Sequence, residues 1–68
     1  MHSFPTILYR RDQDLAVRVF YRAAESPHGG QLAEITIDRV VAGDREVNLS
    51  WAENDRLVND AKNHFSKL

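Results

Sequence analysis

The chain has 68 residues, of which 43% are hydrophobic and 28% are charged, and its formal net charge at pH 7 is −1. This balance is typical of an ordinary globular domain, and the small net charge provides no overall field that would attract nucleic acid or an anionic membrane. No apolar run approaches the roughly 18 residues that a transmembrane helix needs, and the first residues lack the basic and apolar regions of a secretory signal. We therefore expect a cytoplasmic protein that does not insert into a membrane.

The length of the chain predicts one domain over residues 1–68, close to the lower limit of what folds unaided. A domain of this size buries only about 60% of the surface that its unfolded chain exposes. There is no cysteine, so neither a disulfide nor a thiolate zinc site can add stability. Small chains without such cross-links often gain stability by oligomerising, which makes a homodimer one expected state.

The first half of the chain predicts a β-hairpin. A β-branched and aromatic segment predicts a strand at residues 5–11, and a short polar linker leads to a second strand at residues 15–23. The second strand alternates with a period of two, which is typical of a strand with one buried face. The residues expected on the buried face are Leu15, Val17, Val19 and Tyr21, and those expected on the opposite face are Ala16, Arg18, Phe20 and Arg22. Pro27, Gly29 and Gly30 then predict a loop.

A third strand is predicted at residues 32–41, where Ala33, Ile35 and Ile37 alternate with polar residues. Continued alternation would turn Arg39 inward and Val40 outward. We therefore expect either a bend or bulge near Asp38 and Arg39, or a change in the burial of the two faces there.

The segment from Ala42 to Arg45 contains Gly43 and predicts a tight turn. A short fourth strand is expected at residues 46–49, with Val47 and Leu49 inward. The sheet should therefore be an antiparallel meander of three or four strands.

One C-terminal helix is predicted at residues 51–66. Ser50 followed by Glu53 matches a capping box, in which each side chain bonds to the backbone amide of the other residue. The apolar residues that recur at spacings of three and four are Leu57, Val58, Ala61, Phe65 and Leu68, and Trp51 lies two turns before Val58. This stripe should pack on the apolar face of the sheet, which predicts a two-layer α+β domain.

The motifs of common enzyme classes are missing from the sequence. It contains no glycine-rich nucleotide loop, no G-x-S-x-G and no H-E-x-x-H. Asp60 and His64 lie one helical turn apart, but two ligands leave a metal site incomplete. Ser50 and His64 could be drawn as a catalytic pair, yet capping already accounts for Ser50. We expect no catalytic residue, no metal site and no cofactor.

The predicted sheet face opposite the helix carries the candidate binding residues. They are Arg18, Phe20 and Arg22 of the second strand, joined by Leu8 and Arg10 of the first. Arginine interleaved with an aromatic residue could stack on bases, but Glu34 and Asp38 on the neighbouring strand would weaken the attraction for phosphate. A solvated face with cross-strand ion pairs and a protein-binding or self-association face both fit this pattern. The sequence does not choose between the face and an edge strand as the binding surface.

Several segments carry a resemblance to a known class of protein. They are Ala33-Glu34-Ile35-Thr36-Ile37, a glycine turn, Val47-Asn48-Leu49-Ser50, and a helix ending Ala61-Lys62-Asn63-His64-Phe65. This order resembles small uncharacterised proteins encoded in tailed-bacteriophage genomes, which place a strand pair with a Pro/Gly-containing insert before an AEV-x-I strand, a turn, an L-[ST]-x-x-E cap and a terminal helix. The insert is short here, at residues 26–30. The resemblance transfers no catalytic residue, and it implies an accessory phage protein that binds and blocks a host protein.

These observations lead to two expectations about function. The first is a non-enzymatic protein-binding module of phage origin, acting in the host cytoplasm, whose partner is a host protein or a second copy of the chain. The alternative is a small nucleic-acid-binding protein that uses the same sheet face, and such binding would weaken steeply with salt.

Overall fold

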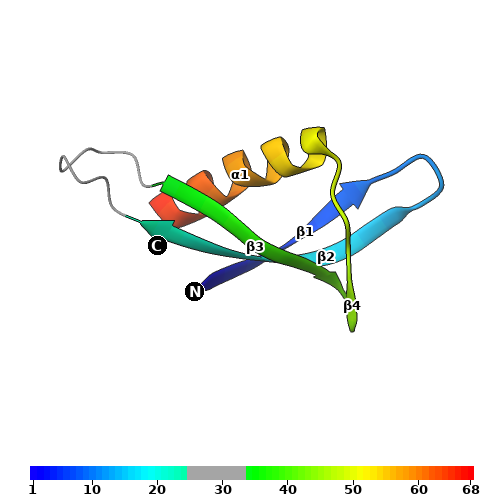
Figure 1. Ribbon diagram of the computed structural model, residues 1–68, viewed down its shortest axis with the longest axis horizontal. Coiled ribbons are helices and arrows are strands. Elements are labelled where there is room, and N and C mark those ends of the chain that lie inside the picture. The colour runs from blue at the N-terminus through cyan, green and yellow to red at the C-terminus, as the bar shows by residue number, and fades with distance from the viewer. Residues whose placement is uncertain (25–33) are drawn as a thin grey trace.

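A four-stranded antiparallel sheet with one helix packed on it makes up the fold of the computed structural model, which describes residues 1–24 and 34–68 (Figure 1). The elements are β1 (His2–Tyr9), β2 (Asp14–Ala24), β3 (Glu34–Ala42), β4 (Arg45–Glu46) and α1 (Trp51–Ser66). The strands lie in the order β1-β2-β3-β4, and each pairs antiparallel with its neighbour. The predicted α+β meander with a C-terminal helix is confirmed. The loop predicted at residues 26–30 and the start of the strand predicted at 32–41 lie outside the described residues.

The first and fourth strands differ most from their predicted bounds, whereas β2 and the end of β3 differ by one residue. The first strand begins at His2 and ends at Tyr9 instead of covering residues 5–11. Pro5 does not interrupt it, because β1 is an edge strand, where a missing backbone N–H is tolerated. The fourth strand covers only Arg45–Glu46 instead of residues 46–49, because the chain leaves the sheet after the bond from Val47 N to the Val40 carbonyl (2.8 Å).

A β-bulge in β3 confirms the expected irregularity. Phe20 pairs with Arg39, whereas the next residue, Tyr21, pairs with Ile37, so that Asp38 is the extra residue. The insertion reverses the alternation of β3. Val40 therefore reaches the core, with 2% of its surface exposed, and Arg39 lies outward against Phe20.

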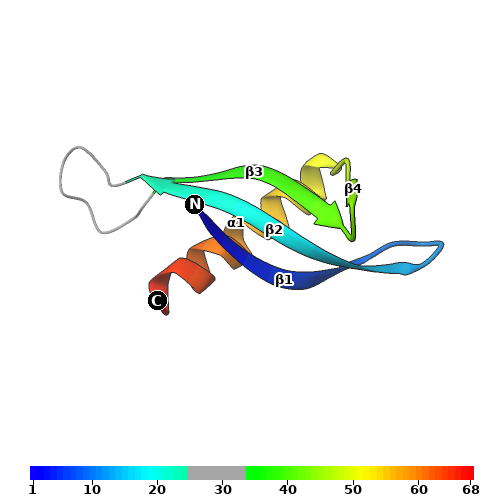
Figure 2. The same cartoon turned by 90° about the horizontal axis from the view of Figure 1, so that it is seen from below.

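The core lies between α1 and the inner face of the sheet. Its buried residues are Phe4, Leu8, Val17, Val19, Tyr21, Val40, Leu57 and Ala61. Val47 and Leu49 pack against this core, as the sequence predicts. Figure 2 shows that α1 crosses the sheet diagonally, from the β4 side to the region beside the start of β1, and leaves the opposite face of the sheet uncovered.

The ends of the predicted helical stripe do not belong to the core. Trp51 is 84% exposed and Leu68 is 71% exposed. At about 100° per residue, Trp51 lies about 100° away from the centre of the stripe formed by Leu57 and Ala61. Leu68 follows the end of α1 at Ser66. The apolar contact with the sheet is therefore shorter than the stripe in the sequence.

The start of α1 and the turn before β4 have the predicted local structure. Ser50 and Glu53 form a complete capping box, with Glu53 N donating to Ser50 Oγ (3.2 Å) and Ser50 N donating to Glu53 Oε1 (3.0 Å). Gly43 has a φ of 66°, a left-handed conformation that favours glycine. In the ranges that the structure describes, no helix is long and apolar enough to cross a membrane.

Candidate protein-binding face

The surface of the sheet opposite α1, here called the open face, is formed by the side chains that alternate with the buried ones. Buried Val17, Val19 and Tyr21 point toward α1, so the intervening residues of β2 point away from it. The open face includes Pro5 and Ile7 of β1, Ala16, Arg18, Phe20 and Arg22 of β2, and Arg39 and Val41 of β3. The structure places Arg18, Phe20 and Arg22 together on this face, as the sequence predicts.

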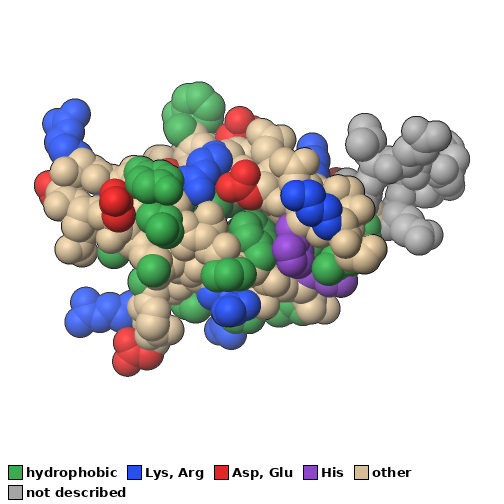
Figure 3. All heavy atoms as spheres, turned by 180° about the vertical axis from the view of Figure 1, so that it is seen from behind, with side chains coloured by type: hydrophobic (Ala, Val, Ile, Leu, Met, Phe, Trp, Pro, Cys, Tyr) green, Lys and Arg blue, Asp and Glu red, His purple; other side chains and the backbone are tan. Residues whose placement is uncertain are grey.

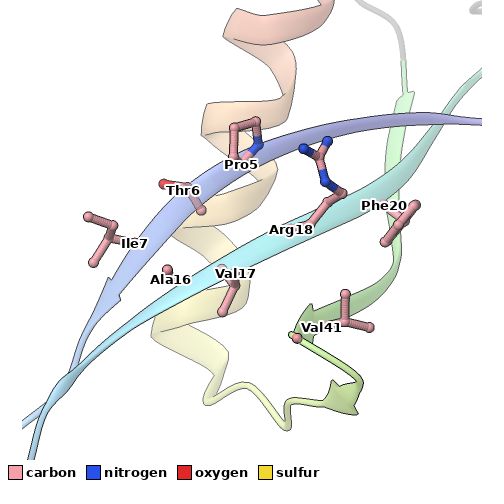
Figure 4. Close-up of a pocket in the computed structure, with 9 residues that line it drawn as sticks. Pro5, Thr6, Ile7, Ala16, Val17, Arg18, Phe20 and Val41 are labelled. Carbon is pink, nitrogen blue, oxygen red and sulfur yellow. The ribbon is translucent and has the colours of Figure 1, made fainter.

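A shallow hollow of about 790 Å³ occupies the centre of the open face. Its lining residues are Pro5, Thr6, Ile7, Ala16, Val17, Arg18, Phe20, Val41 and Gly43. Figure 4 shows the labelled lining residues on β1, β2 and β3, with α1 behind the sheet. Ile7 is 42% exposed and pairs with the small side chain of Ala16, which leaves space beside it. The hollow is thus mainly apolar, and Arg18 is the arginine in its lining.

Two arginines of the open face have no carboxylate partner among residues 1–24 and 34–68. Arg18 donates from Nη1 to Ser3 Oγ (3.2 Å). The Arg39 guanidinium carbon lies 5.0 Å from the centroid of the Phe20 ring, a cation–π contact that holds both side chains in place. Both arginines can still donate hydrogen bonds to an added acceptor.

The third arginine of the face, Arg22, is neutralised within the sheet. Its Nε donates to Asp38 Oδ1 at 2.8 Å, and the Asp38 side chain is only 18% exposed. The other oxygen, Asp38 Oδ2, is buried and has no hydrogen-bond partner in the described part of the chain. The predicted cross-strand ion pair is present at this end of the face. Arg18 and Arg39 have no such partner in the described residues, and the exposed Glu46 lies opposite Val41 on the same face.

Leu8 and Arg10 do not lie on the open face, in contrast to their prediction. Leu8 is fully buried in the core, because it pairs with Leu15 and directly opposed residues of antiparallel strands share a face. Arg10 follows the end of β1, and its side chain bonds to Glu53 and to the Asn48 carbonyl oxygen (2.7 Å). Both residues therefore stabilise the fold on the side of α1.

The contact between Arg10 and Glu53 joins the end of β1 to the cap of α1. Arg10 Nε donates to Glu53 Oε2 (3.0 Å), and Arg10 Nη2 donates to Glu53 Oε1 (3.1 Å). The hydrogen bonds from Arg10 and from the Ser50 amide favour the charged carboxylate, which lowers the pKa of Glu53 below its usual 4.5. This cluster explains why Glu53 is half-buried although it is charged.

An aromatic and histidine cluster at the other end of the molecule is absent from the sequence predictions. Tyr21 Oη and His64 Nδ1 form a hydrogen bond of 2.6 Å, and burial raises the pKa of Tyr21. His2 stacks on Tyr21, and Phe4 stacks on His64, with ring centroids 5.3 and 5.2 Å apart. The described histidines are the purple side chains in Figure 3. The hydrogen bond satisfies a buried hydroxyl, which gives His64 a structural role.

The Asp60 and His64 pattern considered from the sequence does not come together as a site. Asp60 accepts from Arg56 Nε (3.3 Å), and His64 bonds to Tyr21 instead. Among the residues with described positions, no three His, Asp or Glu side chains are grouped so that they could hold a metal ion. Ser50 is engaged as the helix cap.

Comparison of the chain with protein-family models, with curated proteins and with solved structures gives no match.

Proposed function

We propose that this chain is a non-enzymatic protein-binding module and that the open face is its binding surface. The observation that carries the proposal is the mainly apolar hollow between Ile7 and Phe20, with Arg18 in its lining and Arg39 against the Phe20 ring. An exposed apolar patch with a polar border is typical of a protein interaction site. Arginine and aromatic side chains are also the residues most often found as energetic anchors in such interfaces.

Two features of β1 favour the face over this edge of the sheet. Pro5 lies in the middle of β1 and cannot donate a backbone hydrogen bond to an added strand. Arg56 reaches from α1 to β1, where its Nη2 donates to Thr6 Oγ1 (3.1 Å) and its guanidinium lies 5.6 Å from the centroid of the Tyr9 ring. A proline within an edge strand and a positive charge held against that strand both oppose the pairing of a further strand.

The arrangement of charge favours a protein over a nucleic acid. A phosphate backbone needs several unneutralised cations, whereas Arg22 is paired with Asp38 and the chain carries a net charge of −1. The Phe20 ring, which could stack on a base, already has Arg39 over it. Nucleic-acid binding by the same face remains the competing function, and low-salt gel shifts distinguish it.

The resemblance to tailed-phage proteins supports a host protein as the partner. On this proposal the chain is an accessory phage protein that acts in the cytoplasm of the infected cell. Self-association through the open face is disfavoured, because the pairing of two such faces would bring the unneutralised Arg18 and Arg39 of each copy close to those of the other.

Affinity capture from bacterial lysate tests the proposal with three immobilised proteins. The first is the natural chain, the second is Ile7→Lys/Phe20→Lys, and the third is Trp51→Lys, which changes an exposed apolar residue elsewhere. We expect a stoichiometric protein partner that the natural chain and Trp51→Lys retain and the double variant loses. Circular dichroism verifies that each variant is folded. A partner that is retained by the double variant, or the absence of any stoichiometric partner, would refute the proposal.

A further inference from the structure

The unneutralised arginines of the open face are close enough to act together. Arg18 pairs with Val41 across β2 and β3, and Arg39 is two residues before Val41 on β3. Such diagonal neighbours lie about 7–8 Å apart in an antiparallel sheet. Both lie beside apolar side chains, Arg39 over Phe20 and Arg18 within the hollow. The face therefore combines an apolar centre with a paired positive charge, which is complementary to apolar side chains flanked by carboxylates.

The length of the hollow is suited to a short helix. Along β2 the hollow extends from Ala16 to Phe20, with Arg18 midway between them. These four residue steps cover about 13 Å at about 3.3 Å per residue. A helix covers the same distance with about nine residues, at 1.5 Å each, and presents apolar side chains at positions i, i+4 and i+7. Ala16 and Pro5 have short side chains, which leaves room for one such side chain to enter the hollow.

The chemistry of the backbone also favours a helix over an extended segment. Apart from Arg18, the centre of the face offers the side chains of Pro5, Ile7 and Val41, which cannot bond to the peptide groups of a strand laid across them. An extended segment would leave its N–H and C=O groups unpaired against that apolar surface, at a cost in free energy. A helix satisfies those groups internally. The other face of the sheet is already covered by α1 in this way.

We propose that the open face binds an acidic amphipathic helix of a partner protein, whose apolar stripe fills the hollow and whose Asp or Glu side chains pair with Arg18 and Arg39. This inference rests on the proposed function, because both use the open face, and it specifies the chemistry of the partner. The complex would be a three-layer arrangement with the sheet between two helices.

Synthetic helical peptides provide the probe. Three fluorescently labelled peptides share one leucine stripe and carry Glu, Gln or Lys beside it, and their dissociation constants are measured by fluorescence anisotropy. At about 0.1 M salt we expect the Glu peptide to bind at least about tenfold more tightly than the Lys peptide. At about 1 M salt, where the Debye length falls from about 10 Å to about 3 Å, most of this difference should disappear.

Two matched variants test whether the face causes the preference. Arg18→Gln/Arg39→Gln should remove the preference for the Glu peptide. Arg11→Gln/Arg45→Gln makes the same change in net charge at two exposed arginines outside the open face and should keep it. If the Glu peptide binds equally to both variants, the inference is wrong.

The remaining outcomes separate this inference from the proposed function. Equal binding of all three peptides would overturn the acidic partner and support the apolar face. No peptide binding would overturn the helical partner, while the lysate capture decides independently whether the face binds protein at all. Tighter binding of a labelled single-stranded oligonucleotide than of the Glu peptide, with a steep salt dependence, would overturn both in favour of nucleic acid.

Discussion

The substitution Glu53→Gln tests how far the start of α1 depends on a single charge. Glu53 accepts hydrogen bonds from the Ser50 amide and from two nitrogens of Arg10. Glutamine has one acceptor oxygen instead of two, so the two-bond contact with Arg10 is lost together with the charge. A partly exposed ion pair contributes about 0.2–1 kcal/mol, and a carboxylate at a helix N-terminus contributes about 0.3–1 kcal/mol. We therefore expect a loss of about 1 kcal/mol at neutral pH, or about 4–8 °C in Tm.

The pH dependence of this loss gives the sharper test. Because folding lowers the pKa of Glu53, its contribution to stability is fully present above the unfolded pKa of about 4.5 and is lost as the pH falls through the lower folded pKa. The difference in Tm between the natural chain and Glu53→Gln, measured by circular dichroism, should be present at neutral pH and vanish at acid pH below that folded value.

A second acid on the same helix is the control for Glu53→Gln. Asp60 pairs with Arg56 at a spacing of four residues, and both side chains are more than one third exposed. Asp60→Asn should cost only about 0.3–0.5 kcal/mol at neutral pH. A cost of Glu53→Gln that is no greater than that of Asp60→Asn, or that is the same at neutral and acid pH, would refute the stabilising role of the Glu53 charge.

Three further changes test the core and the backbone, each by urea unfolding. Leu57→Ala removes a fully buried side chain and should cost about 2–5 kcal/mol, whereas Trp51→Ala, at a residue 84% exposed, should change the free energy of unfolding by less than about 0.5 kcal/mol; equal effects would contradict the observed core. Tyr21→Phe deletes the hydrogen bond to His64 and should cost about 0.5–1.5 kcal/mol, and an unchanged stability would show that this bond contributes nothing. Gly43→Ala should cost about 1–2 kcal/mol because of its positive φ, although no other atom obstructs a Cβ there; a neutral result would mean that the turn can change its conformation.

The elements with a single strong local signal were predictable from the sequence. The capping box defined the start of α1, and the alternation of β2 assigned its two faces correctly. The bulge in β3 was also predictable, because Arg39 would otherwise have been buried without a partner. In each case one physical requirement excluded the other local arrangements.

The first strand was ambiguous because both of its faces are apolar. Ile7 and Leu8 are similar in hydrophobicity, so alternation alone does not decide which one is buried. The register with β2 decides it, since Leu8 pairs with Leu15 and Ile7 pairs with Ala16. That information is a long-range pairing, which a local pattern does not contain. The same register brings Ile7 into the hollow. Ile7 was not among the binding residues predicted from the sequence.

Trp51 and His64 were misjudged for different reasons. The spacing of Trp51 from Val58 indicated the same side of the helix, but Val58 itself lies at the margin of the buried stripe and is only half-buried. His64 was considered only as part of an incomplete metal site or a catalytic pair, whereas it bonds to Tyr21, 43 residues away in the sequence. A buried hydroxyl needs a hydrogen-bond partner. The sequence predicted that Tyr21 is buried, but it did not identify His64 as the partner of its hydroxyl.

The bulge at Asp38 determines how the length of β3 can change during evolution. Ile37 and Val40 both face the core although they are three residues apart, because Asp38 is an extra residue between them. Deletion of that extra residue would leave the two apolar residues two positions apart, so that strict alternation would keep both on the buried side and the residue between them on the open face. A single-residue gap at the bulge in an alignment of related chains would therefore indicate a regular strand with the same core.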